Sequence, residues 1–276
     1  MADVKLIGDG IPQIGYGTWN RDGDAAYEGV INALEVGYRH IDGAEGYNNE
    51  EFVGKAIAES GVARSDIFLT TKVAPESFAP GQITGHVEAS LEKLRTDQVD
   101  LLLLHYPSID DEYDIKDYMA QFAAVFDKGL TKRIGVSNFT IRYIDLALEL
   151  LGDRKLSTNQ VEIHPLMQNY PIVEHCAKKG IPMTAYSPLA RGAVADVAVL
   201  KNIAQAHDVT PQQVSLAFLM HEGYVVIPSA GAKERIASNF EAKDIVLNEE
   251  EMSKIRGADQ NMRLVNGSWC PAFDKY

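Results

Sequence analysis

The chain has 276 residues, 46% of them hydrophobic and 24% charged, which is the composition of a folded globular protein and excludes a disordered or collagen-like chain. Its formal net charge of −13 repels nucleic acids and anionic membranes, so we expect neither as a partner. Two cysteines, Cys176 and Cys270, are too few for a disulfide framework. The opening residues lack the order of a signal peptide and no apolar run is long enough to cross a bilayer, so we expect a cytoplasmic protein.

Short apolar runs rich in β-branched residues recur along the chain and predict strands. They are Ile14–Trp19, Tyr38–Ala44, Ile67–Val73, Val99–Tyr106, Arg133–Asn138, Asn159–Ile163, Pro182–Pro188 and Tyr224–Pro228. Between them, apolar residues spaced three and four apart predict helices, most clearly at Ala25–Leu34, Glu51–Glu59, Val87–Leu94, Tyr118–Phe126 and Tyr143–Leu151. Ahead of the first strand, a Gly8-Asp9-Gly10 turn within Val4–Ile14 predicts a β-hairpin.

The alternation of strands and helices predicts a single α/β domain over residues 1–276, because no linker interrupts it. The strand Val99–Tyr106 is apolar on both faces, so helices must cover the sheet and its strands must run parallel. Eight such units predict a (β/α)8 TIM barrel. An open doubly wound sheet is the alternative, but the stretch from Gly15 to Asn20 lacks the last glycine of a Gly-x-Gly-x-x-Gly motif.

Polar residues at the ends of three consecutive predicted strands are the candidates for chemistry, because sites in such barrels form where the strands end. Asp42 lies near the end of the second strand and is soon followed by Tyr47. Lys72 lies at the end of the third strand and His105 at the end of the fourth. We therefore expect the four side chains to line one side of the barrel opening.

Two interpretations of these residues stand side by side. Lys72 and Asp42 form either a structural ion pair or part of a catalytic site, because a buried ammonium needs a partner in both cases. In the catalytic interpretation the ammonium lowers the pKa of Tyr47 toward neutral pH and makes the phenol a general acid. His105 is either an ordinary hydrogen-bonded histidine or a second donor to the same substrate oxygen.

The catalytic interpretation suits one reaction, the protonation of a carbonyl oxygen while electrons arrive at its carbon. No protein side chain supplies a hydride. We therefore expect an organic cofactor such as a nicotinamide.

The chain resembles the aldo-keto reductases, and the similarity extends over nearly its whole length. The motifs are Gly15-Tyr16-Gly17-Thr18-Trp19, Gly37-Tyr38-Arg39-His40-Ile41-Asp42 with Tyr47, Thr71-Lys72, Leu104-His105, Ile134-Gly135-Val136-Ser137-Asn138-Phe139, Asn159-Gln160-Val161-Glu162 and Ala185-Tyr186-Ser187-Pro188-Leu189. Within the family the chain looks most like the bacterial 2,5-diketo-D-gluconate reductases of the B type, which also act on methylglyoxal. Ile227-Pro228-Ser229 and Arg263-Leu264-Val265 carry that closer resemblance.

The resemblance implies roles for the catalytic residues: Tyr47 donates the proton, Lys72 and Asp42 tune it, and His105 orients the carbonyl group. It also implies that Tyr186 stacks on the nicotinamide ring, although Tyr186 taken alone is equally an ordinary half-buried aromatic residue. The other residues that the resemblance places at the cofactor are Ser137, Asn138 and Gln160 at the carboxamide, Ser187 and Leu189 along the pyrophosphate, and Ser229, Lys233, Arg235 and Asn239 at the adenosine phosphate.

The cofactor expected from the resemblance is NADPH, with NADH as the alternative. Many members of the family have Lys-Ser where this chain has Ser229-Ala230, so the usual lysine partner of the 2′-phosphate is missing. Lys233 and Arg235 follow closely and supply the missing charge, or else form the solvated start of the last helix.

The residues expected around the substrate are Trp19, Phe78, Tyr106 and Trp269. Tyr106 stands where tryptophan is common in the family, and Gly43 stands where threonine is usual. Trp269 belongs to the C-terminal segment Asn266–Tyr276, which the resemblance places as a loop over the barrel opening; the alternative is that this segment only packs against the barrel.

The resulting expectation is a monomeric NADPH-dependent oxidoreductase that reduces small aldehydes, α-dicarbonyls or keto-sugars to alcohols. Two alternatives stay open: a polyol or xylose dehydrogenase that uses NAD(H), and a regulatory barrel that binds the cofactor without turnover. We expect no metal site, because His164, His175 and His221 have no companions at ligand spacing.

Overall fold

The computed structural model describes residues 4–275, so Met1 to Asp3 and Tyr276, the last residue of the predicted C-terminal segment, lie outside the described residues. An eight-stranded parallel sheet forms the centre of the molecule, and each strand pairs with its neighbour along the chain. The strands are β3 (Tyr16–Gly17), β4 (His40–Asp42), β5 (Phe68–Val73), β6 (Leu101–Leu104), β7 (Ile134–Ser137), β8 (Leu156–Glu162), β9 (Met183–Tyr186) and β10 (Val225–Val226).

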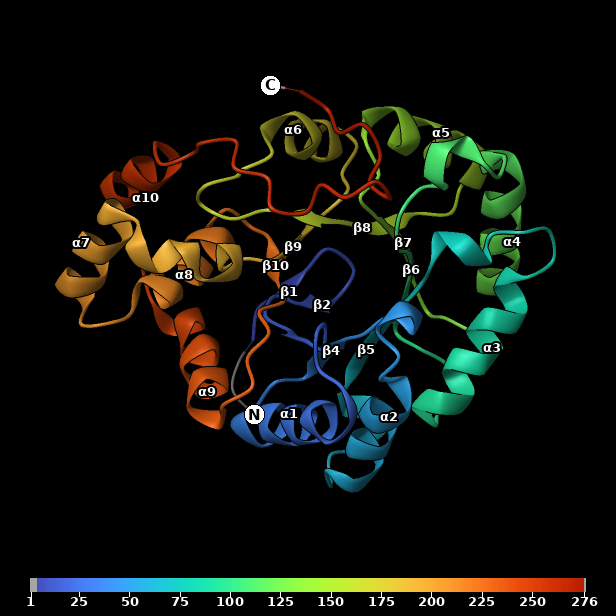
Figure 1. Cartoon of the computed structure of the whole chain (residues 1–276), viewed down its shortest axis with the longest axis horizontal. Helices are drawn as coiled ribbons and strands as arrows, with labels where there is room; N and C mark the ends of the chain where they lie inside the picture. Colours follow the sequence, from blue (N-terminus) through green and yellow to red (C-terminus); the bar gives the residue numbers. More distant parts are fainter. Residues whose placement is uncertain (1–3, 276) are drawn as a thin grey trace.

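Helices follow the strands and surround the sheet (Figure 1). A buried stripe with three- and four-residue spacing explains their contact with the sheet; in α5 it consists of Tyr143, Ile144, Ala147 and Leu151. The helices are α1 (Gly23–Val36), α2 (Glu50–Glu59), α3 (Ile83–Leu94), α4 (Ile115–Asp127), α5 (Ile141–Leu151), α6 (Tyr170–Lys178), α7 (Ala198–His207), α8 (Pro211–His221), α9 (Lys233–Glu241) and α10 (Glu249–Arg256).

The sheet curls until its first and last strands lie next to each other. The Gly15 amide donates to the Val226 carbonyl at 2.8 Å, and the Val226 amide donates to the Gln13 carbonyl at 2.9 Å. Gly17 permits the two edges to approach because it has no Cβ atom. A Cβ atom at this position would lie only 2.8 Å from the Ile227 carbonyl oxygen and would clash with it.

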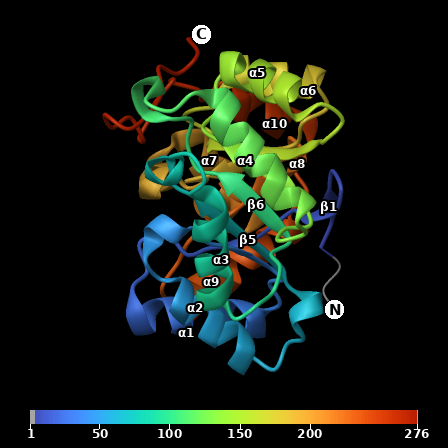
Figure 2. The ribbon, with the colours of Figure 1, turned by 90° about the vertical axis from the view of Figure 1, so that its right-hand side faces the viewer.

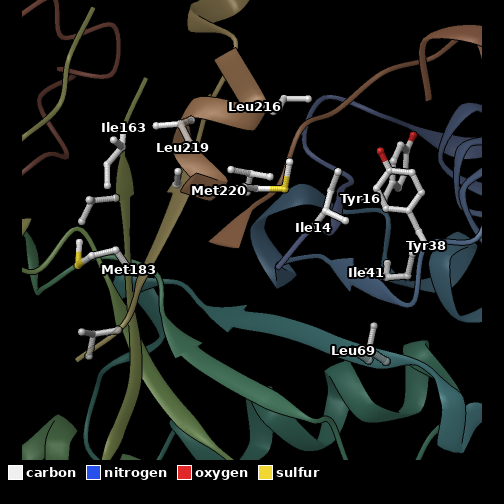
Figure 3. Close-up of a cluster of buried hydrophobic side chains, with 14 of the residues drawn as sticks. Ile14, Tyr16, Tyr38, Ile41, Leu69, Ile163, Met183, Leu216, Leu219 and Met220 are labelled. Carbon is white, nitrogen blue, oxygen red and sulfur yellow. The ribbon is translucent and has the colours of Figure 1, made fainter. Parts of the chain in front are cut away.

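Two hydrophobic cores cover the two faces of the curled sheet. Leu102 and Leu104 of β6 belong to the larger core, which includes buried residues of the surrounding helices and is shown in part in Figure 3. Leu101 and Leu103, which alternate with them, belong to a smaller core with Ile11, Phe68, Val225 and Ile227. Burial on both faces explains why the leucine run is apolar throughout.

The predicted hairpin consists of β1 (Leu6–Ile7) and β2 (Ile11–Pro12), which pair antiparallel. Ile11 is fully buried in the smaller core beside Phe68 and Leu101, which begin β5 and β6. The hairpin therefore covers the amino ends of the strands. It lies on the opposite side of the molecule from the C-terminal segment (Figure 2).

Each of the eight predicted strands contains or overlaps an observed strand, although most observed strands are shorter. β8 is the exception, because it begins at Leu156 rather than at Asn159. Its Ser157 and Thr158 are buried, and polar side chains hide a buried strand from an apolar pattern. Within residues 4–275, no helix combines the length and apolar character needed to span a bilayer.

Candidate active site

The carboxyl ends of β4, β5 and β6 bring the four predicted catalytic residues together. Asp42 is the last residue of β4, and Lys72 precedes the last residue of β5. His105 directly follows β6. Tyr47 ends the short 3-10 turn Glu45–Tyr47, which begins three residues after β4. Parallel neighbours in one sheet end at the same edge, and this places the four side chains at one site.

A buried ion pair lies at the bottom of this site. The Lys72 Nζ atom is 2.5 Å from Asp42 Oδ1 and 2.7 Å from the Gly43 carbonyl oxygen, and both charged residues are 1% exposed. The second carboxylate oxygen, Asp42 Oδ2, accepts a hydrogen bond of 2.8 Å from Gln160 Nε2. Burial lowers the pKa of Lys72, but Asp42 and Tyr47 outweigh burial and raise it overall, so the amine stays an ammonium.

The Tyr47 hydroxyl lies 3.4 Å from Lys72 Nζ, as expected for a phenol beside an ammonium. The prediction that this neighbour lowers the pKa of Tyr47 is wrong for the net direction. Burial raises the pKa of Tyr47, and although the charge and hydrogen bond of Lys72 lower it, burial prevails. Tyr47 is therefore a neutral phenol at physiological pH.

His105 packs its ring edge-on against the ring of Tyr47, with 5.6 Å between the ring centres. Burial, and then the charge of Lys72, lower the pKa of His105 well below its ordinary value. The imidazole is therefore neutral, with one nitrogen as donor and the other as acceptor. No partner for either nitrogen occurs among the hydrogen bonds of residues 4–275, so the ring is available to a ligand.

These side chains open into a cavity of about 390 Å³. Its lining is mixed, because acidic, aromatic and amide residues meet residues of the loops after β9 and β10. The lining residues are Gly17, Trp19, Asp42, Gly46, Tyr47, His105, Tyr106, Asn138, Gln160, Tyr186, Ser187, Pro188, Leu189, Arg191, Ile227, Pro228, Ser229, Val265 and Trp269.

One side of the cavity presents an aromatic ring with amide groups beside it. The Tyr186 hydroxyl donates to Asn138 Oδ1 at 2.9 Å, and Asn138 Nδ2 donates to the His105 carbonyl at 3.0 Å. Ser137 lies behind this layer, outside the cavity lining, where its hydroxyl donates to the Gln160 carbonyl at 2.8 Å. A flat aromatic face flanked by amide donors and acceptors fits the ring and carboxamide of a nicotinamide.

The residues predicted at the adenosine phosphate are only partly brought to the cavity. Ser229 lines it, whereas Lys233, Arg235 and Asn239 of α9 do not. The Lys233 ammonium lies 2.6 Å from Glu35 Oε2 on the surface, so a carboxylate already offsets its charge. Arg235 is exposed and has no carboxylate partner among the described residues.

Three of the four predicted substrate-pocket residues line the cavity, namely Trp19, Tyr106 and Trp269. The prediction for Phe78 is wrong. Phe78 is fully buried in the larger core, where its ring stacks on Tyr118 with 4.7 Å between the ring centres. The turn after β5 directs this side chain inward, which its position in the sequence did not indicate.

Sequence reasoning missed two arginines and a glutamate. Arg191 lines the cavity and lies 5.5 Å from the ring centre of Trp19, and the Arg21 Nε atom lies 3.4 Å from Ser229 Oγ. Glu45 joins the Tyr47 turn to the loop after β5, because its Oε1 atom accepts hydrogen bonds from the Ala74 amide at 2.6 Å and from a serine hydroxyl. Arg21 lies in a loop, and Arg191 and Glu45 lie in short 3-10 turns, where no periodic pattern marks them.

Among the residues that the structure describes, no three His, Cys, Asp or Glu side chains gather closely enough to hold a metal ion.

Comparison with known proteins identifies a family. The model described as Aldo/keto reductase family matches residues 10–260 of this chain. Methylglyoxal reductase DkgB of Escherichia coli O157:H7 is 42% identical over 256 residues, which cover 93% of this chain and 96% of that protein. The Salmonella typhi protein of the same name is 42% identical over 265 residues, covering 96% of this chain and 99% of the relative.

Solved structures give the same result. A protein provisionally named 2,5-diketo-D-gluconic acid reductase B has a TM-score of 0.94 at 33% identity, with 98% of both chains covered. The aldose reductase of Schistosoma japonicum has a TM-score of 0.89 at 32% identity, with 95% of this chain and 94% of that chain covered.

Replacement of Lys72 tests how the buried charges depend on each other. Lys72→Met should lower the free energy of unfolding by about 3–5 kcal/mol, because Asp42 is left as an uncompensated buried charge. Removing both charges in Lys72→Met/Asp42→Leu should restore part of that loss. Urea denaturation measures both effects.

The matched control for this experiment is Lys132→Met. Lys132 pairs with Asp100 at 2.8 Å, but its side chain is 47% exposed. Its replacement should cost no more than about 1 kcal/mol. Equal losses for the two lysine variants would contradict the account of the buried pair.

Proposed function

The chain belongs to the aldo/keto reductase family, and we propose that it is an NADPH-dependent oxidoreductase that reduces small aldehydes, α-dicarbonyls or keto-sugars to alcohols. One observation carries the proposal: Tyr47 lines the cavity, its hydroxyl lies 3.4 Å from the Lys72 ammonium, and its ring lies beside the neutral ring of His105. This arrangement suits the delivery of a proton to a carbonyl oxygen.

Reduction of a carbonyl group needs a hydride at the carbon and a proton at the oxygen. A bound nicotinamide supplies the hydride. Tyr47 supplies the proton, and its raised pKa keeps the phenol protonated until the oxygen becomes basic. His105 donates a hydrogen bond to the same oxygen and so orients the substrate.

Lys72 and Asp42 support Tyr47 after the proton has left. The phenolate that forms is stabilised by the Lys72 ammonium, which Asp42 holds at 2.5 Å. The negative charge of Asp42 also compensates the positive charge of Lys72, so the buried ammonium is not left unpaired. The pair therefore stabilises the charge that develops on Tyr47 without making it acidic at rest.

The residues that would hold the cofactor form two groups. Asn138, Gln160 and Tyr186 would hold the nicotinamide, with Ser137 fixing the layer behind them. Along the phosphates and the adenosine they would be Ser187, Leu189 and Ser229, with Arg191 added by its place in the cavity lining. Asn239, also expected there from the resemblance, lies outside the lining.

We propose that Arg21 and Arg235, rather than Lys233, select NADPH. Arg21 lies against Ser229, and neither arginine is paired with a carboxylate among residues 4–275. Arginine is well suited to a phosphate because its planar guanidinium donates two parallel hydrogen bonds. Lys233 is already paired with Glu35.

The proposed substrate class draws on the relatives as well as on the cavity. The relatives named methylglyoxal reductase cover nearly the whole chain, and the cavity has aromatic walls at Trp19, Tyr106 and Trp269. A cavity of about 390 Å³ with aromatic walls and several polar groups suits small dicarbonyls and keto-sugars.

We also propose that the curled sheet is the closed (β/α)8 barrel expected from the sequence. The hydrogen bonds from Gly15, Val226 and Gly17 across the two edges, and the parallel bridge of Ile14 with Val226, support closure.

Tyr47→Phe tests the proposed chemistry. It removes only the hydroxyl, so kcat with methylglyoxal should fall by about 10²–10⁴-fold. Binding of NADPH, followed by quenching of its fluorescence, should change by less than about twofold because the ring remains in place.

Tyr27→Phe is the control, because it removes a hydroxyl that bonds Glu59 on the surface, and Tyr27 is not among the residues that line the cavity. It should leave kcat unchanged. Retention of more than a few per cent of the activity by Tyr47→Phe would refute the assignment of the proton donor, and NADPH binding by the wild type without turnover of any carbonyl would favour a regulatory protein.

Cofactor choice is tested by Arg21→Ala and Arg235→Ala, with Lys233→Ala as the matched control. Each arginine variant should weaken NADPH binding by about tenfold and leave NADH binding nearly unchanged, because the two cofactors differ only in the 2′-phosphate. Titration calorimetry measures both. Parallel losses for the two cofactors, or a larger effect in Lys233→Ala, would count against this choice.

A further inference from the structure

A buried carboxylate at the end of β8 takes no part in the chemistry described above. Glu162 is the last residue of β8 and is fully buried, as is His164 two residues later. The His164 Nε2 atom lies 3.0 Å from Glu162 Oε1. A carboxylate only accepts hydrogen bonds, so this nitrogen of His164 carries the proton.

The remaining hydrogen bonds of the Glu162 carboxylate go to the backbone of Leu264 and Val265, directly before the C-terminal segment that begins at Asn266. The Leu264 amide donates to Glu162 Oε1 at 2.8 Å, and the Val265 amide donates to Oε2 at 2.9 Å. Burial raises the pKa of Glu162, but the bonds from His164 and the two amides outweigh burial and lower it overall. The group is therefore a carboxylate with both oxygens occupied by donors.

These two amides lie next to the cavity wall. Val265 lines the cavity, and Trp269, four residues later, lines it as well. The Trp269 side chain is one of the few large apolar groups with half of its surface exposed, so the body of the protein does not hold it by burial. Its side chain interacts with the Tyr106 hydroxyl, so the position of the ring depends on that contact and on how the backbone before it is fixed.

Near the wall residues, the Cys270 amide also donates to the Gly267 carbonyl at 3.0 Å, the Cys270 Sγ atom lies 3.9 Å from the Val265 carbonyl oxygen, and Arg263 Nη2 donates to Asn169 Oδ1 at 3.3 Å. Two bonds to the rest of the protein lie farther from the wall residues along the chain. The Met262 amide donates to the Leu166 carbonyl at 2.9 Å, and Asp274 Oδ2 accepts from the Ile141 amide at 3.0 Å. In the stretch from Met262 to Asp274, the wall residue Val265 has its backbone amide bound directly by a charged acceptor, and that acceptor is Glu162.

We propose that Glu162 is a positioning residue for substrate selection: by binding the amides of Leu264 and Val265 it fixes the C-terminal segment so that Val265 and Trp269 form one wall of the cavity. The inference rests on the proposed reduction of carbonyl compounds in this cavity. It assigns Glu162 no contact with the substrate and no role in proton transfer.

Glu162→Gln is the variant that tests this. The amide side chain keeps the size of the carboxyl group, but its NH2 group faces one of the two backbone amides and cannot accept from it. The Leu264 and Val265 amides should then exchange with solvent deuterium about 10- to 100-fold faster, because a charge-assisted bond is lost. Mass spectrometry of the full-length protein measures this without any substrate.

Steady-state kinetics with two carbonyl compounds measure how Glu162→Gln changes the choice of substrate. An aromatic aldehyde reaches the Trp269 wall, whereas methylglyoxal, with three carbons, is small enough to bind beside Tyr47 alone. Glu162→Gln should raise KM for the aromatic aldehyde about 3- to 10-fold and change KM for methylglyoxal less, with kcat for methylglyoxal retained. In a Trp269→Ala background, Glu162→Gln should have no further effect on this KM ratio.

Asp100→Asn is the matched control. Asp100 is 6% exposed and also accepts from a backbone amide, that of Leu69 at 3.0 Å, but it lies at the amino end of β6. It should change neither the exchange of the C-terminal amides nor the KM ratio. Should Glu162→Gln not fold, Leu264→Pro removes one of the two donors from the other side of the contact and should shift the ratio in the same direction.

The outcomes separate this inference from the proposed function. Wild-type protein that reduces neither compound would refute the proposed function, while the exchange measurement would still test the anchoring. Active wild-type protein with an unchanged KM ratio in Glu162→Gln, or effects of Glu162→Gln and Trp269→Ala that simply add, would overturn the role of Glu162 in selection.

Discussion

The ion pair of Lys72 and Asp42 is the interaction on which the rest of the site depends. It connects β4 to β5 directly and reaches β8 through the 2.8 Å bond from Gln160 to Asp42. A buried ion pair of this kind contributes little net stability, because the desolvation of two charges roughly offsets their attraction. Its value lies in fixing an ammonium at one point of the cavity floor, 3.4 Å from the Tyr47 hydroxyl.

Burial sets the protonation states around this pair. Removal from water favours the neutral forms of Tyr47 and His105, and it raises the pKa of the first and lowers that of the second. The site therefore holds one cation, one anion and two neutral donors at physiological pH. These four groups can give a proton to a carbonyl oxygen and stabilise the negative charge that then remains on Tyr47.

Much of this arrangement was predictable from the sequence, because parallel strands bring their carboxyl ends to one edge. Asp42 and Lys72 lie at the carboxyl ends of their strands and His105 directly follows one, so the three residues meet. The leucine run before His105 is buried on both faces, as its pattern indicated. The start of β8 escaped prediction because its buried residues include Ser157 and Thr158, whose hydroxyls find partners inside the protein.

Side-chain direction and energetic balance were not predictable in the same way. Phe78 follows a strand end as Tyr106 does, yet the turn after β5 directs it into the core against Tyr118. The net pKa shift of Tyr47 depends on how much water is excluded, which spacing does not reveal. The contacts of Glu162 and Arg191 span long sequence separations. Glu162 belongs to one of the family motifs, but nothing in that motif indicates Leu264 or Val265 as its partners.

The protonation state of Tyr47 tests the central claim most directly. With ¹³C at the Cζ atoms of the tyrosines, and the Tyr47 signal assigned by its loss in a Phe variant, a pH titration by NMR follows the phenol itself. Because burial prevails over the ammonium, we expect a neutral phenol from neutral pH to beyond about pH 10, the ordinary pKa of tyrosine. A phenolate populated at or below about pH 8 would contradict it, because the ammonium would then outweigh burial.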